Sequence, residues 1–120
     1  MNPPTHEIEF TVALRQYDPT VDELTGDPEW NLDDPHVVDH YTSNEPYLAP
    51  AARQAAVEAW ARARLWRAVA TNPNCLYDCW LTRYEHDPLD RDWRPTAHAL
   101  YHHDEHLLDH QAPLIQWFNV

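Results

Sequence analysis

Four histidines recur at every fourth position near the C-terminal end of the sequence: His98, His102, His106 and His110. Residues four apart share one face of a helix, so two such imidazoles can ligate the same metal ion. In a helix over 95–111, which the pattern predicts, the most compact ligand set is His102, His106 and Asp109, with His110 beside it. The spacing is therefore compatible with zinc or another divalent metal, and equally with a solvated polar face.

A metallopeptidase motif is not completed in this segment. H-E-x-x-H requires Glu directly after the first His, and His103 occupies that position between His102 and His106. The two cysteines, Cys75 and Cys79, lack the second pair that a zinc knuckle needs. We therefore expect no obligatory cofactor and keep the histidine-rich segment as an alternative site.

Glycine and serine are almost absent. Gly26 is the only glycine, which excludes the phosphate-binding loop, the dinucleotide-binding turn and the G-x-S-x-G nucleophile elbow, because each needs several glycines at fixed offsets. Ser43 is the only serine, and we find no Ser-His-Asp arrangement. The sequence thus favours a binding protein over an enzyme.

The charge is strongly negative: 20 acidic residues face 8 arginines, and lysine is absent, for a formal net charge of −12. Such a chain repels nucleic acid and anionic membranes, so neither is an expected partner. Mimicry of DNA by the acidic residues 16–45 is a third interpretation, in which the chain inhibits a nucleic-acid-binding protein. No apolar run approaches membrane-spanning length and no signal-peptide pattern is recognised, which predicts a cytoplasmic protein.

Basic residues concentrate in one region. Residues 48–73 carry four arginines and a single glutamate, between two acidic flanks. We expect an acidic N-terminal segment to lie against this basic region, because opposite charges at short range lower the self-repulsion of the chain.

The elements that must position these residues are predicted from hydrophobic periodicity. Residues 7–15 alternate as a half-buried strand, and Pro50 begins a helix over 50–70. Residues 75–86 fit a second helix, with a strand as the alternative, and 95–111 fit a third. Residues 114–120 can form a strand that pairs with 7–15, and 16–48 reads as a long acidic coil. The prediction is one α+β domain over 1–120, mostly helical.

Aromatic residues supply the leading functional interpretation. The chain has six Trp, six Tyr and two Phe, and Trp and Tyr are enriched at the hot spots of protein interfaces. We therefore predict a small acidic protein-binding protein, as accessory subunit, adaptor or inhibitor, whose partner is another protein or a second copy. The predicted contact residues are Trp30, Tyr41, Tyr47, Trp66 and Trp117.

Overall fold

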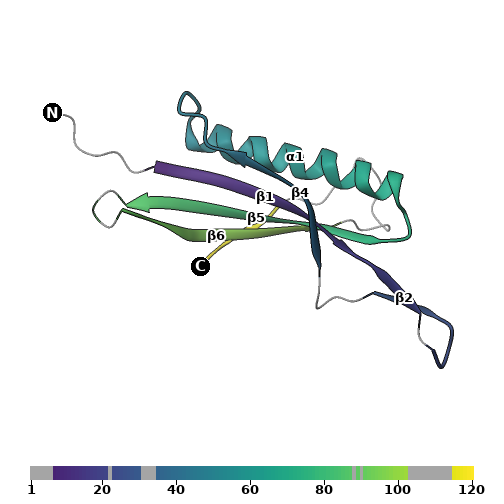
Figure 1. Cartoon of the computed structure of the whole chain (residues 1–120). Helices are drawn as coiled ribbons and strands as arrows, with labels where there is room; N and C mark the ends of the chain where they lie inside the picture. The colour runs from purple at the N-terminus through teal and green to yellow at the C-terminus, as the bar shows by residue number, and fades with distance from the viewer. Residues whose placement is uncertain (1–6, 22, 31–34, 88, 90, 103–114) are drawn as a thin grey trace.

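The computed structural model describes residues 7–21, 23–30, 35–87, 89, 91–102 and 115–120. A five-stranded antiparallel sheet, in the order β4-β1-β5-β6-β7, carries one long helix, α1, across one face (Figure 1). The elements of this layer are β1 Glu7–Tyr17, β4 His36–Ser43, α1 Pro50–Thr71, β5 Leu76–Asp87, β6 Asp92–His102 and β7 Trp117–Asn119. The fold is mostly β, so the prediction of a mostly helical protein is wrong.

The helix predicted over 50–70 is present as α1, with Pro50 in its first turn. Alanine and arginine dominate it, with nine and four of its 22 residues, and both are good helix formers. Its buried side chains recur every three or four residues and form one stripe against the sheet: Val57, Ala61, Leu65 and Ala68. The stripe gives the helix one apolar face, which the sheet covers.

The sheet supplies the other half of the core through alternate residues of its central strands. From β1 these are Phe10, Val12 and Leu14; from β5, Tyr77, Cys79 and Leu81; from β6, Ala97, Ala99 and Tyr101. Side chains two apart in a strand point to the same face, so each strand gives this face every second residue. The remaining residues of the same strands form the opposite face of the sheet.

The prediction of a helix over 75–86 is wrong, and the strand alternative is right. β5 pairs along its length with β1 on one side and β6 on the other. Its apolar positions satisfy a period of two as well as a helical period, since Tyr77, Cys79 and Leu81 are buried. Its many aromatic residues suit the sheet, and pairing with two neighbours overrides the local helical signal.

The prediction of a helix over 95–111 is also wrong where the structure describes it. Residues 92–102 form β6, in which the small side chains of Ala97 and Ala99 lie beneath α1 while His98 points to the other face. Residues 103–111 lie outside the described part of the chain. Ala97 and Ala99 are therefore core positions of a strand.

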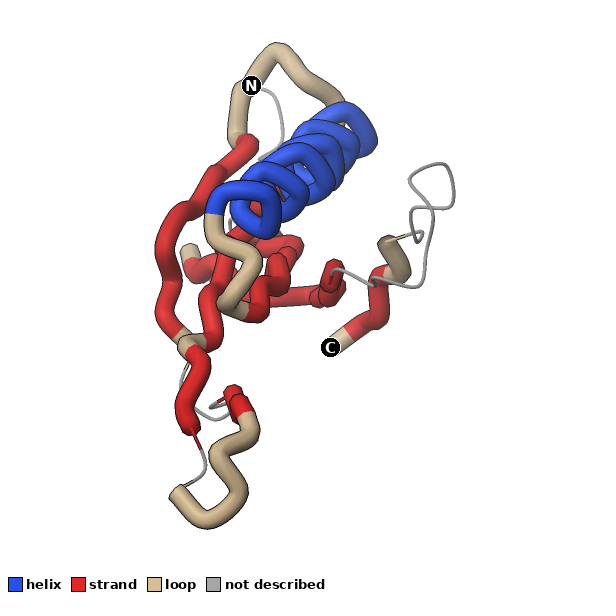
Figure 2. The backbone as a smooth tube through the Cα atoms, turned by 90° about the vertical axis from the view of Figure 1, so that its right-hand side faces the viewer, coloured by secondary structure: helices blue, strands red, loops and turns tan. Residues whose placement is uncertain are grey.

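Residues 16–48 are not a long coil. They contain the end of β1, all of β4, and the strands β2 Pro19–Val21 and β3 Pro28–Trp30, which pair with each other. Gly26 adopts a positive φ of 74° in the connection between β2 and β3, a conformation that glycine takes without strain. We call residues 18–30 the arm, because this ribbon extends beyond the sheet, away from α1 (Figure 2).

The C-terminal strand has a different neighbour from the one predicted. β7 pairs with β6, through Ala97 opposite Asn119 and Ala99 opposite Trp117, and β1 is not its neighbour in the sheet. β1 instead lies between β4 and β5. The predicted strand over 7–15 is therefore present, but it is a central strand with two partners and not one half of a terminal pair.

Candidate protein-binding face

Aromatic side chains cross the face of the sheet that α1 leaves uncovered. Trp80 of β5 stacks on His98 of β6, with ring centroids 4.8 Å apart and planes 26° from parallel. Phe118 of β7 lies 6.2 Å from Trp80 and 6.0 Å from His98, measured between ring centroids. Leu100, the cross-strand neighbour of Trp80, stands on the same face. We call Trp80, His98, Leu100 and Phe118 the aromatic patch.

The outer members of the aromatic patch are accessible. Phe118 is 51% exposed and Leu100 is 42% exposed, whereas Trp80 and His98 are half-buried. His98 is held in place by Thr82, because its Nδ1 lies 3.2 Å from the Thr82 hydroxyl. Trp80 and His98 are thus held in fixed positions next to the exposed side chains of Phe118 and Leu100.

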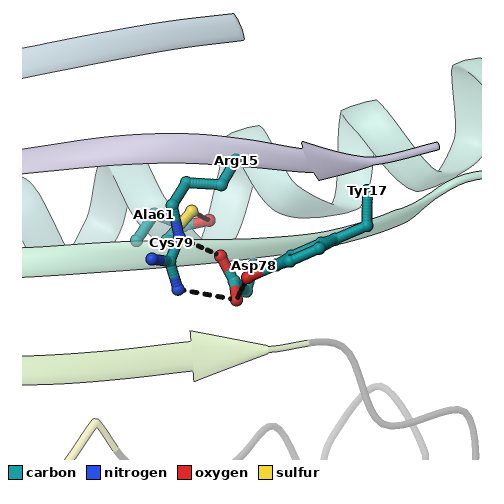
Figure 3. A network of polar contacts seen from close by, with 5 residues as sticks. All are labelled: Arg15, Tyr17, Ala61, Asp78 and Cys79. Carbon is teal, nitrogen blue, oxygen red and sulfur yellow. Dashed lines mark hydrogen bonds and ion pairs between the residues drawn. The ribbon is translucent and has the colours of Figure 1, made fainter. Parts of the chain in front are cut away.

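Arg15 extends this row onto β1. Its guanidinium carbon lies 5.5 Å from the Trp80 ring centroid and 6.0 Å from that of Tyr17, within the range of cation–π attraction. The guanidinium Nε and Nη2 donate hydrogen bonds to the two carboxylate oxygens of Asp78, at 2.7 and 2.9 Å (Figure 3). The Tyr17 hydroxyl donates to the same carboxylate at 2.7 Å.

The register of the sheet explains this network. β1 and β5 pair with Arg15 directly opposite Asp78, so two unlike charges share one face. The hydrogen bond from Arg15 to Asp78 raises the pKa of the guanidinium, and burial, followed by the bond to Asp78, raises the pKa of the Tyr17 hydroxyl. Asp78 is buried. Both of its carboxylate oxygens accept hydrogen bonds, so its role is structural: it holds Arg15 against Trp80.

The predicted contact residues do not gather on one surface. Tyr41 stacks on Trp60 of α1, with centroids 6.1 Å apart, and contributes to the side of the core. Trp117 packs edge-on against Phe10 and donates its indole N–H to Glu58 at 3.0 Å. Both side chains are therefore largely committed to internal packing.

The other three predicted contact residues lie on separate elements. Tyr47, in the connection between β4 and α1, is 82% exposed, and Trp66 on α1 is 38% exposed. Trp30 belongs to β3, where its backbone pairs with that of Pro19. Tyr47 and Trp66 are accessible, but neither is part of the aromatic patch.

The predicted metal ligands are not assembled in the described residues. His98 and His102 lie four residues apart on a strand, which separates their backbones by about 13 Å, too far for one ion. His106, Asp109 and His110 lie outside the described part of the chain. Within that part, no group of three or more His, Cys, Asp or Glu side chains has the arrangement of a metal site.

The two cysteines occupy different environments and are not joined by a disulfide. Cys79 is buried beneath α1, where its Sγ lies 3.8 Å from the Ala61 carbonyl oxygen (Figure 3). Burial is the largest cause that raises the pKa of its thiol to about 12. Cys75 is half-buried, before the start of β5. Cys79 is thus a small core residue.

This combination of sheet, helix and arm was compared with known proteins. Nothing matched. No protein-family model fits the sequence, and no curated protein or solved structure is similar to the chain. The described residues contain no helix that is both long and apolar enough to cross a membrane.

Sequence reasoning missed most of the residues on the open face, including Trp80, Phe118 and Arg15. A signal was present in the alternation of 76–84, where Asp78, Trp80 and Thr82 share one strand parity and Tyr77 and Cys79 the other. Choosing the strand for this segment would have placed Trp80 beside Asp78 on one face. The partners on β1, β6 and β7 depend on register, which the sequence pattern did not supply.

Proposed function

We propose that this chain is a small acidic protein-binding protein, an accessory subunit or adaptor, that docks a partner protein on the aromatic patch. The observation that carries the proposal is the exposure of Phe118 and Leu100 beside the stacked Trp80 and His98. Aromatic side chains dominate the energetics of protein interfaces. Rings that are already packed lose little conformational entropy when a partner covers them, which favours binding.

The chemistry of the partner follows from the surroundings of the patch. Arg15 is neutralised by Asp78, and the chain as a whole carries a net charge of −12. A complementary partner surface is apolar at its centre and basic at its rim, because such a rim speeds association with an acidic protein and selects against acidic competitors. This partner is a different protein, because the aromatic patch of a second copy offers no basic rim: its Arg15 is already paired with Asp78.

The two alternative functions have weaker support. A metal protein requires ligands that converge, and His98 and His102 on β6 do not converge. DNA mimicry draws on the acidic residues 16–45, and those described are divided among the end of β1, the ribbon of β2 and β3, the edge strand β4 and their connections. A protein partner that loses bound DNA when this chain is added would favour mimicry over the adaptor role.

The test compares matched variants in capture from a source lysate, followed by binding measurements with the purified partner. Phe118→Asp and Leu100→Asp place a charge in the aromatic patch, whereas Leu89→Asp places one at another exposed leucine, 86% exposed in the turn after β5. We expect Phe118→Asp to weaken binding at least about tenfold and Leu89→Asp to leave the affinity unchanged. Equal affinities for all three variants and the wild type would refute the role of the patch.

A further inference from the structure

The arm ends in an apolar side chain between acidic ones. The sequence of residues 18–30 contains five acidic residues and no basic one. Leu24, near the tip, is 96% exposed, with Glu23 before it and Asp27 three residues after it. The turn is ordered by a hydrogen bond of 3.2 Å from the Asp27 backbone N–H to the Thr25 hydroxyl. An exposed leucine flanked by carboxylates suits a hollow that is apolar inside and basic at its rim.

The body of the protein contains such a hollow. Two adjoining depressions, of about 250 and 170 Å³, lie along α1 and share Arg64 and Arg67 in their linings. Apolar side chains and the stems of polar ones complete them: Leu14, Val38, Ala68 and Tyr77 in the larger, and Trp60 and Ala63 in the smaller. We call the two depressions together the arginine groove.

The positive charge of the arginine groove is only partly neutralised. Arg64 donates from Nε to Asp39 of β4 at 2.8 Å. Arg67 is exposed and takes part in no ion pair among the described residues. An arginine without an ion pair lowers the repulsion that a chain with a net charge of −12 exerts on an acidic group at this place.

The tip of the arm does not reach the groove of its own chain. Gln16 lines the larger depression at the base of the arm, and Leu24 follows eight residues later. At about 3.3 Å per residue the tip stands roughly 26 Å away, and pairing of β2 with β3 keeps the arm extended. The arm points away from α1 in the view of Figure 2, and the molecule is 68 Å long.

We propose that the tip of the arm, residues 23–27, docks in the arginine groove of a second copy of this chain. Leu24 enters the apolar lining, and the carboxylates of Glu23 and Asp27 pair with Arg67 at the rim. Charge complementarity selects this occupant, because an extension with five acidic residues and no basic one meets a groove lined by Arg64 and Arg67. The contact uses neither Phe118 nor Leu100, so it is independent of the proposed function.

The first experiment measures molar mass against concentration by light scattering and sedimentation velocity, with purified full-length protein. We expect the wild type to associate as its concentration rises, and Leu24→Asp or Arg67→Glu to remain monomeric over the same range. Both positions are exposed, so circular dichroism should show the wild-type fold. Leu89→Asp and Arg94→Glu, at exposed positions outside the tip and groove, serve as matched controls that associate like the wild type.

A mixing experiment isolates the predicted pair of surfaces. Leu24→Asp retains an intact groove and Arg67→Glu retains an intact tip, so an equimolar mixture regains one working contact. We expect mixed dimers from two variants that are each monomeric alone. A wild type that stays monomeric up to about 100 µM, or variants that associate as the wild type does, would overturn the proposal.

The same measurement separates this proposal from the function proposed for the aromatic patch. Phe118→Asp should self-associate like the wild type while losing the partner protein, and Leu24→Asp should do the opposite. Self-association that Phe118→Asp abolishes and Leu24→Asp preserves would place the contact between copies on the open face of the sheet, and would overturn the docking of the arm.

Discussion

Arg15 and Asp78 stand opposite each other on β1 and β5 and are joined by two hydrogen bonds of 2.7 and 2.9 Å. The pair couples the first strand of the chain to a strand 63 residues later. It also fixes the guanidinium 5.5 Å from the Trp80 ring, so the charge pair and the aromatic patch form one continuous structure. The residues that stabilise this face therefore also support the aromatic patch.

Asp78→Leu should lower the free energy of unfolding by about 2–3 kcal/mol, because it leaves a partly buried guanidinium without its carboxylate and the Tyr17 hydroxyl without an acceptor. Arg15→Met/Asp78→Leu should cost less than the sum of the two single changes. Urea unfolding measures all three values, with the exposed Asp92→Asn as control. Strict additivity would show that the ion pair contributes nothing beyond its separate parts.

Cys79 should be inert and Cys75 reactive in the native protein. With a thiol pKa of about 12, the thiolate fraction of Cys79 at pH 8 is on the order of 10⁻⁴, and α1 also blocks access. A thiol reagent should therefore modify one cysteine quickly and the second only after denaturant is added. Cys75→Ser should remove the fast reaction and Cys79→Ala the slow one; two fast reactions in the wild type would contradict the burial of Cys79.

The ion pair between Asp39 and Arg64 should give stability that acid removes. The hydrogen bond from Arg64, followed by that from the His40 backbone N–H, lowers the pKa of the Asp39 carboxyl. A lowered pKa in the folded state stabilises the fold at pH values above the unfolded pKa of about 4. This contribution is lost as the pH falls through the folded pKa.

The measurement compares the wild type with Asp39→Asn by denaturant unfolding between about pH 7 and pH 2.5. The difference in the free energy of unfolding should be constant above about pH 5 and shrink towards zero in acid. It should be small, because the Asp39 side chain is 39% exposed and solvent screens the pair. A difference that grows as the pH falls has the wrong sign for this pair.

Two elements could be predicted from the sequence because their patterns are long and satisfy one period only. The helix from Pro50 has its buried stripe at helical spacing over 22 residues, and 7–15 alternates with Ala13 as its one exception. The histidine spacing is different. Residues four apart share a face in a helix and also in a strand, so the spacing of His98 and His102 does not distinguish a helix from a strand.

The candidate site could be predicted only by residue type. Trp and Tyr residues were predicted as contact residues because these types are enriched at interfaces. Residue type alone does not show whether a ring is packed in the core or exposed at the surface. Trp117 packs against Phe10 and donates a hydrogen bond to Glu58, whereas its neighbour Phe118 is exposed. Neighbouring residues of a strand point to opposite faces of the sheet. Which of the two points inwards depends on how this three-residue strand pairs with β6.

The central place of β1 in the sheet has a consequence for synthesis on the ribosome. Its apolar residues Phe10, Val12 and Leu14 need β5 and α1 as neighbours, and Asp78 follows Arg15 by 63 residues. At translation rates of about 5–20 residues per second, β1 waits several seconds before β5 exists. During this time the nascent chain carries a sheet-forming segment whose strand partner β5 has not been made. Folding then depends on long-range strand pairing, which is slow compared with helix formation.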